Sequence, residues 1–329
     1  MRALRFHQFG NLDLLHVEDL PTPHAGEGEV VVEIRAASLN PSDVKNVQGR
    51  MEGTTLPRVP GRDFSGVIVE GPKESLGREV WGVGGDIGFT RDGSHAETMV
   101  VPIGGARPKP GNLSFEEAAA VGVNFVTAYL GLVERAQVKA EDTVLVTGAG
   151  GGVGSAVIQL AGLKGARVFA LDRELAPRRP RGVAREFTGS TDADYERVIG
   201  EVREATGGKG VDLVFDTVGG PLFEPSLRML GQLGRQVNIT STGTRRASFD
   251  LLDFYHKRLS LFGVDSRALD TVASAAILEE LAPAFENGTL LAPNVQHRFT
   301  LDQLIEAYRA VDRGTLRGKA VLSFTRATA

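Results

Sequence analysis

The chain has 329 residues, 42% of them hydrophobic and 24% charged, which is typical of a globular protein large enough for two domains. A formal net charge of −4 and a sequence pI of about 5.9 argue against a nucleic-acid partner. Cysteine is absent, which excludes disulfides and zinc sites built on thiolates.

Neither a membrane span nor a metal site is predicted. No apolar run approaches the roughly 18 residues of a transmembrane helix, and the N-terminal segment MRALRFHQFG lacks the apolar core of a signal peptide. The six histidines are scattered, with no H-x-x-x-H pair. We therefore expect a cytoplasmic protein with no membrane partner.

The first hundred residues read as short strands separated by turns. The runs 30–36, 64–70 and 79–83 are rich in β-formers and are bounded by proline and glycine clusters. The predicted secondary structure changes from strands to helices near Leu113. Ser114 and Glu117 form a capping box ahead of an alanine-rich helix, and a second helical stretch is expected over 123–136.

From Thr143 onward, strands and helices alternate, which predicts βαβ crossovers and a parallel sheet. The strands are expected at 143–147, 167–171, 211–216, 234–239 and 259–264, and the helices at 153–164, 196–206 and 221–230. The tail is expected to form helices at 271–287 and 301–314 and a last strand at 319–324.

A glycine-rich loop joins the first of these strands to its helix. Thr143–Thr147 runs into the segment GAGGGVG, residues 148–154, which is a variant of the G-x-G-x-x-G pattern. Glycines allow a tight turn and close approach to a pyrophosphate, which the free N–H groups of the helix start can bind. A dinucleotide site is predicted here, with a turn made only for packing as the alternative. The predicted contacts in the loop are Gly150, Gly151, Gly152 and Val153.

The next strand ends near an acid and a basic cluster that favour different cofactors. Asp172 can accept hydrogen bonds from a free ribose 2′-hydroxyl, as in NAD(H), or can serve only as a cap or turn residue. Guanidinium groups suit the 2′-phosphate of NADP(H), although a solvated loop is the alternative. The arginines of this loop are Arg173, Arg178, Arg179 and Arg181. We predict NADP(H), with NAD(H) as the second possibility.

Further segments, in order along nearly the whole chain, resemble the zinc-free medium-chain dehydrogenase/reductase superfamily, in its quinone oxidoreductase (zeta-crystallin-like) branch. They are ASLNPSD (37–43), VPGRDFSG (59–66), DGSHAE (92–97), TAY (127–129), FDTVG (215–219) and GKAV (318–321). The stretch LFGVDS (261–266) is also similar to reductases that saturate acrylyl-type enones.

This resemblance implies an α/β fold with two domains. A GroES-like β-rich catalytic domain would comprise residues 1–116 and 266–329, and a Rossmann domain with a doubly wound parallel sheet would comprise residues 117–265. The resemblance also implies that the nicotinamide lies in a cleft between them and that the protein is a homodimer, paired through the last Rossmann strand.

The sequence departs from the zinc alcohol dehydrogenases of the same superfamily. Their catalytic zinc is held by Cys, His and Cys, and the matching positions here are Asn40, Arg62 and Val123. None of these can rebuild that site, so we predict no metal. An acceptor reduced without zinc should delocalise the developing charge, as quinones and enones do.

The resemblance suggests three catalytic candidates. Asn40 would position the nicotinamide or the substrate oxygen, or would serve as a cap. Arg62 would stabilise an enolate, or would pair with Asp63 or Asp43. Thr127 would touch the nicotinamide ring, or would pack at a helix start. His95 and Tyr129 are possible proton donors, with a structural role as the alternative for His95.

The remaining cofactor contacts follow from the resemblance alone. Lys45 would contact the cofactor or be solvated, and Lys319 would lie near the cofactor or on the surface. The other positions are Val218, Gly219, Thr240, Ser241, Val264, Asp265 and Ser266.

The predicted activity is NAD(P)H-dependent reduction of a small-molecule quinone or enone. An enoyl or acrylyl-thioester reductase and a non-catalytic, crystallin-like NADPH-binding protein are the alternatives, because a fold alone does not establish a function.

Overall fold

The computed structural model describes residues 1–174 and 181–324, which form two compact units. The first comprises Met1–Val126 and Ser266–Ala329, and the second Thr127–Asp265, so that the first boundary falls inside a helix, α2 (Phe115–Tyr129). Within the described ranges, no helix combines the length and the apolar character needed to cross a bilayer.

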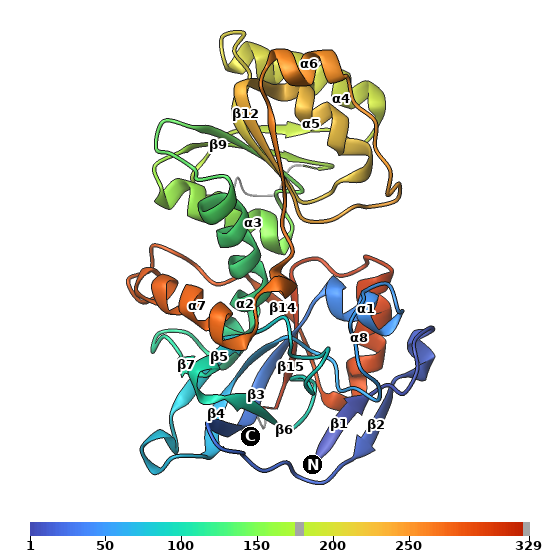
Figure 1. Ribbon diagram of the computed structural model, residues 1–329, viewed down its shortest axis with the longest axis vertical. Coiled ribbons are helices and arrows are strands. Elements are labelled where there is room, and N and C mark those ends of the chain that lie inside the picture. The colour runs from blue at the N-terminus through green and yellow to red at the C-terminus, as the bar shows by residue number, and fades with distance from the viewer. Residues whose placement is uncertain (175–180, 325–329) are drawn as a thin grey trace. The chain divides into compact units, whose positions relative to one another are not determined.

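The first unit is built on a seven-stranded sheet with the order β14-β15-β3-β4-β5-β7, and β6 pairs with β3 (Figure 1). Its pairs are antiparallel except for β14 with β15. The strands are β3 (Glu29–Leu39), β4 (Asp63–Glu70), β5 (Glu79–Val83), β6 (Thr98–Pro102), β7 (Arg107–Pro108), β14 (Val295–Phe299) and β15 (Lys319–Ser323). A separate hairpin joins β1 (Arg2–Arg5) and β2 (His16–Asp19).

The core of this unit is apolar and continuous. Phe6, Ile34, Phe64 and Leu322 are buried in one cluster, together with Tyr308 from α8 (Leu304–Asp312). Full burial of each such side chain contributes on the order of 2 kcal/mol.

The helices of the first unit pack around this sheet. Helix α7 contacts β5, β6 and β7, and α1 contacts α8. The elements are α1 (Pro41–Val47), α7 (Thr271–Glu286) and the 3-10 turns η1 (Leu12–Leu14), η2 (Lys73–Ser75), η3 (Ile103–Gly105), η6 (Ser266–Ala268) and η7 (Leu301–Gln303).

The second unit is a parallel six-stranded sheet with the order β10-β9-β8-β11-β12-β13. The order runs outward in both directions from β8, which is the doubly wound topology of a Rossmann fold. The strands are β8 (Thr143–Thr147), β9 (Arg167–Asp172), β10 (Val183–Thr188), β11 (Val211–Asp216), β12 (Leu230–Asn238) and β13 (Ser260–Gly263).

Helices cover this sheet, as the alternating pattern predicts. Helix α3 packs on β8 and β9, and α5 packs on β11, β12 and α4 (Figure 1). The elements are α3 (Gly152–Leu163), α4 (Asp192–Ala205), the turn η5 (Gly220–Leu222), α5 (Phe223–Met229) and α6 (Leu251–His256).

One predicted boundary is wrong. The sequence suggested two helical stretches after Ser114, whereas α2 runs unbroken to Tyr129 and continues as a π-helix, η4 (Leu130–Arg135). Thr127 therefore lies near the end of a long helix and not at a helix start. The capping box is confirmed, since Glu117 N–H donates to Ser114 Oγ at 3.2 Å and Ser114 N–H donates to Glu117 Oε2 at 2.9 Å.

Candidate active site

The glycine loop turns directly from β8 into α3. Helix α3 begins at Gly152, with Gly151 at its N-cap, and the Gly151 N–H donates to the carbonyl of Gly148 at 3.0 Å. A Cβ on Gly154 would lie 2.3 Å from the Gly148 carbonyl oxygen, so any side chain there would push the helix away from the turn. The close packing leaves the first N–H groups of α3 at the strand end.

Asp172 ties this loop to the end of β9. Its Oδ2 accepts the Gly150 N–H at 2.7 Å, and its Oδ1 accepts the Arg173 N–H at 2.7 Å. The carboxylate is therefore placed beside the glycine loop, where the resemblance expects the ribose of the cofactor. Arg178 and Arg179, named above for the 2′-phosphate, lie outside the described residues.

A third tie joins the ends of β8 and β11. Asp216 Oδ1 accepts the Thr147 hydroxyl at 2.6 Å and the N–H groups of Val218 and Gly219 at 3.0 and 2.9 Å. Gly219 has a φ of 64°, and a Cβ there would lie 2.3 Å from the carbonyl oxygen of Thr240. The segments predicted to line the cofactor groove are thus held together at the carboxyl ends of neighbouring strands.

These features fit a dinucleotide. In open α/β sheets, ligands bind at the carboxyl ends of the strands, and the N-terminus of a helix binds a pyrophosphate through its free N–H groups. Here a glycine cradle that a Cβ would fill opens a twelve-residue helix at the central strand. Gly150–Val153 would hold the phosphates, and Asp172 would reach the ribose.

The first unit holds a buried polar cluster around Asn40, at the start of α1. The Asn40 backbone N–H donates to Asp43 Oδ2 at 2.7 Å, which caps the helix through the carboxylate three residues along. The Asn40 side chain faces other partners. Its Nδ2 donates to Asp63 Oδ2 at 2.8 Å, and its Oδ1 accepts from Lys319 Nζ at 2.5 Å.

Lys319 and Asp63 reach the cluster from two sheet strands and are almost fully enclosed. Lys319 is 8% exposed and begins β15, so the alternative of a surface role is wrong. Asp63 is fully buried at the start of β4, and its Oδ1 accepts the Val123 N–H of α2 at 2.7 Å. The cluster therefore joins α1, α2, β4 and β15.

Burial governs the protonation of these groups. Burial raises the pKa of Asp43 to about 7 and that of Asp63 above its usual range, while nearby Lys319 and Arg62 act in the opposite direction. Burial also lowers the pKa of Lys319, although the neighbouring carboxylates hold it up. Placing two carboxylates beside two cations is how a protein interior tolerates such charges.

Arg62 lies at the edge of this cluster and is 2% exposed. Its Nε donates to the Gly84 carbonyl at 3.0 Å, and its Nη1 donates to Ser266 Oγ at 3.3 Å. Ser266 is the first residue of η6, so the arginine joins the turn after β5 to the returning chain.

His95 is buried nearby and serves as a link between elements. Its Nδ1 lies 2.9 Å from Tyr308 Oη and its Nε2 lies 3.1 Å from the Ser38 carbonyl oxygen. Burial lowers the pKa of His95 to about 4, so the ring is neutral near pH 7. Both ring nitrogens have protein partners, which favours the structural alternative over that of a proton donor.

The other predicted residues are spread over both units. Lys45 lies half-buried on α1, where desolvation lowers its pKa, and Thr127 is buried on α2. Val264 follows β13, and its N–H donates to the Asn238 carbonyl at 3.0 Å. Thr240 and Ser241 follow β12, and Asp265 precedes Ser266.

Sequence reasoning missed the carboxylates as members of the site. Asp43 and Asp63 were named only as partners of Arg62, and Asp216 only as part of a motif. The signal for Asp43 was its spacing three residues after Asn40, which is that of a capping residue. For Asp216 the signal was its position at the last residue of a buried strand.

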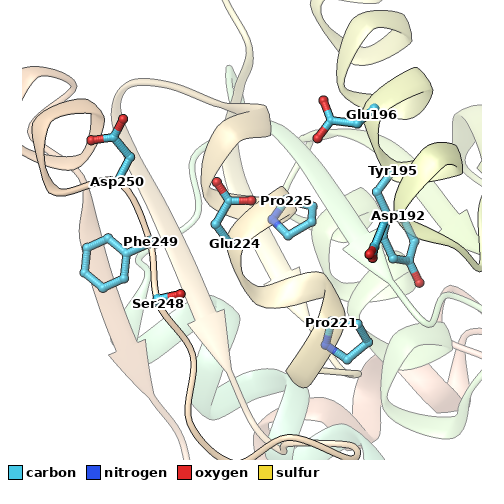
Figure 2. Close-up of a pocket in the computed structure, with 9 residues that line it drawn as sticks. All are labelled: Asp192, Tyr195, Glu196, Pro221, Glu224, Pro225, Ser248, Phe249 and Asp250. Carbon is cyan, nitrogen blue, oxygen red and sulfur yellow. The ribbon is translucent and has the colours of Figure 1, made fainter.

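A separate pocket of about 560 Å³ lies on the second unit, between α4, α5 and the segment before α6 (Figure 2). Tyr195 and Phe249 line it together with four carboxylates, those of Asp192, Glu196, Glu224 and Asp250. Three of these carboxylates already have structural partners. Glu196 and Glu224 both pair with Arg228, and Asp250 caps α6 by accepting the Leu252 N–H at 2.8 Å.

Among residues 1–174 and 181–324, no group of three or more His, Asp or Glu side chains is arranged to hold a metal ion.

Two family models match the chain. Residues 26–111 match the alcohol dehydrogenase GroES-like domain, and residues 184–322 match the zinc-binding dehydrogenase model.

Proteins with similar sequences and structures cover almost the whole chain. A zinc-type alcohol dehydrogenase-like protein of Schizosaccharomyces pombe is 37% identical over 90% of this chain and 88% of its own length. A quinone oxidoreductase-like protein 2 homolog of Nematostella vectensis is 30% identical over 98% of this chain and 88% of its own. The crystal structure of an NAD-dependent alcohol dehydrogenase, 32% identical, covers 99% of this chain and 100% of its own, with a TM-score of 0.87.

Proposed function

We propose that this chain, an oxidoreductase that belongs to the medium-chain dehydrogenase/reductase superfamily, is a zinc-independent, NAD(P)H-dependent reductase of quinones or of activated C=C bonds in enones. The observation that carries the proposal is the Asn40–Asp63–Lys319 set, since Asn40 is one of the positions that match, by resemblance, the zinc ligands of zinc-dependent relatives. A bound nicotinamide would supply the hydride.

The side chains at the matching positions support zinc independence. Asn40 is committed to Asp63 and Lys319, Arg62 donates to Gly84 and Ser266, and Val123 offers only a backbone N–H, which Asp63 accepts. Two cationic side chains here would repel a third cation. No thiolate is available anywhere in the chain.

The acceptor class follows from this chemistry. Without a Lewis acid, a simple carbonyl would leave a localised alkoxide, whereas a quinone or an enone spreads the charge over a conjugated system. The residues must then orient the substrate and donate hydrogen bonds. We assign Asn40 and Arg62 as donors and Thr127 as a nicotinamide contact. The stretch 261–266, similar to acrylyl-type reductases, keeps thioester reduction as the second candidate.

The cofactor preference turns on one loop. The Asp172 carboxylate, held beside Gly150, favours the free 2′-hydroxyl of NADH and would repel a 2′-phosphate. Arg173 and Arg181, with the two arginines outside the described residues, favour the phosphate of NADPH. NADPH stays the proposed hydride donor, and the ratio of the activity with NADPH to the activity with NADH tests this preference.

We also propose that the protein is a homodimer that pairs through β13. This strand ends the six-stranded sheet and bonds to β12 on one side.

The function is tested by following NADPH and NADH oxidation with 1,4-benzoquinone, 9,10-phenanthrenequinone and a simple enone, with a chelator present throughout. We expect turnover that the chelator leaves unchanged. Activity that requires a stoichiometric zinc ion would overturn zinc independence. Cofactor binding without turnover would favour a thioester substrate, to be tried next with a crotonyl thioester, and failure there would leave the non-catalytic alternative.

A further inference from the structure

We infer that Asp63 and Lys319 are positioning residues that fix the Asn40 side-chain amide in one orientation and polarise it, leaving one N–H free to donate to the reacting oxygen. The inference rests on the proposed reductase function and deepens it. It gives Lys319 a role different from the position near the cofactor that the resemblance implies.

The orientation of the amide follows from the charges of its neighbours. An ammonium group can only donate, so the atom 2.5 Å from Lys319 Nζ must be the amide oxygen. A carboxylate can only accept, so the atom 2.8 Å from Asp63 Oδ2 must be the amide nitrogen. A flipped amide would place its NH₂ group against the ammonium of Lys319, donor against donor, and its oxygen against the carboxylate of Asp63, acceptor against acceptor.

Both partners are themselves held in place. The second oxygen of Asp63 accepts the Val123 N–H at 2.7 Å, and a Cβ on Gly122 would lie 2.4 Å from that oxygen. Asp63 therefore cannot rotate freely. The Asn40 backbone is fixed by the bond to Asp43. The amide is thus set by three elements besides its own, α2, β4 and β15.

The charge of Lys319 also changes the amide as a donor. An ammonium at the amide oxygen favours the resonance form with negative oxygen and positive nitrogen. That form makes the amide N–H groups stronger donors, as hydrogen bonds in a chain polarise one another in a low dielectric. The carboxylate of Asp63 contributes by fixing the orientation of the amide.

The second Nδ2–H of Asn40 has no partner within the described part of the chain. A buried donor without a partner costs stability, which is tolerated where a ligand supplies the acceptor. A developing oxyanion on a quinone or an enone is such an acceptor.

The test uses the single variants Asn40→Ala, Asp63→Asn and Lys319→Met, and double-mutant cycles that combine Asn40→Ala with each of the other two. Each single change is expected to lower kcat roughly tenfold or more, the effect of losing a hydrogen bond to a charged site. If Lys319 acts through Asn40, adding Lys319→Met to Asn40→Ala costs little further. Lys319→Arg, which keeps the cation, is expected to restore part of kcat.

Lys109→Met is the matched control. Lys109 is another enclosed lysine of the first unit, and its Nζ donates to the Leu113 carbonyl at 2.5 Å and pairs with Glu79. Losing it tests the general cost of deleting a buried cation, and kcat is expected to stay unchanged.

Two readouts do not depend on turnover. The side-chain NH₂ resonances of Asn40, assigned with the Asn40→Ala variant, are expected to show one proton protected from exchange, and Asp63→Asn is expected to remove that protection. The dissociation constant for NADPH, from fluorescence titration, is expected to change little in Lys319→Met.

Three results would overturn the inference: additive losses in the cycle, an unprotected Asn40 amide, or a Lys319→Met variant whose defect is confined to cofactor affinity. If the wild-type protein reduces no acceptor, the reductase proposal fails, while the exchange measurement still decides whether the amide is held.

Discussion

The Asp172 carboxylate is bound by the backbone of the glycine loop, next to the position proposed for the cofactor ribose. It accepts the N–H groups of Gly150 and Arg173, so its charge is held at the edge of the glycine loop. The strand end and the acid were predicted from sequence. The bond to Gly150 was not, because the two residues lie 22 positions apart and only the packing of β9 beside β8 brings them together.

Replacing that charge tests the cofactor preference. Asp172→Asn keeps an oxygen that can accept the Gly150 N–H and removes the negative charge, so the loop should stay folded. We expect the ratio of kcat/KM for NADPH to that for NADH to rise about tenfold, equivalent to about 1.4 kcal/mol of relieved repulsion. An unchanged ratio in a variant with unchanged thermal stability would show that Asp172 does not face the 2′ position.

Among the elements, the buried strands were the easiest to predict. The ranges 79–83, 143–147 and 211–216 agree with β5, β8 and β11, because short apolar runs bounded by turn residues have few alternative structures. Two edge strands, β10 and β14, were missed for the opposite reason. β10 carries exposed Arg185 and half-buried Glu186, and β14 has three consecutive polar residues between Val295 and Phe299, so neither forms an apolar run.

The contact of His95 with α8 and β3 was also beyond sequence reasoning, since Tyr308 lies 213 residues away.

The burial of His95 makes the stability of the folded protein depend on pH. In the unfolded chain, His95 titrates near its usual pKa of about 6.5, whereas in the folded protein its pKa is about 4. Between these values only the unfolded state binds the proton, so stability is lost as the pH falls from about 6.5 to about 4.

His95→Gln keeps a polar side chain that does not titrate. We expect the free energy of unfolding of the wild type to fall more steeply between pH 6.5 and 4 than that of the variant, by at most about 3 kcal/mol. Asp43, whose pKa is raised, changes stability in the opposite sense and does so in both proteins. The fluorescence of Trp81, buried in the same unit, reports urea unfolding at each pH. Parallel pH profiles would contradict the neutral, buried histidine.

For the whole molecule, the two edges of the six-stranded sheet differ in chemistry. The strand β10 presents charged residues, which is a common protection against pairing with another chain. The strand β13, with the sequence SLFG, carries no charge, and Leu261 on it is 36% exposed. An apolar edge strand of this kind is a template for a second copy, which supports the proposed homodimer.

Leu261→Lys puts a charge on that edge, so we expect the wild type to sediment as a dimer and the variant to shift toward the monomer. Leu163→Lys is the control, since Leu163 is a similarly exposed leucine, 43%, of the same unit but lies at the end of α3. Sedimentation velocity across a range of concentrations measures the result. A monomeric wild type, or equal behaviour of the two variants, would show that β13 is not the contact. If Leu261→Lys is monomeric and still reduces the acceptor, each subunit carries a complete site.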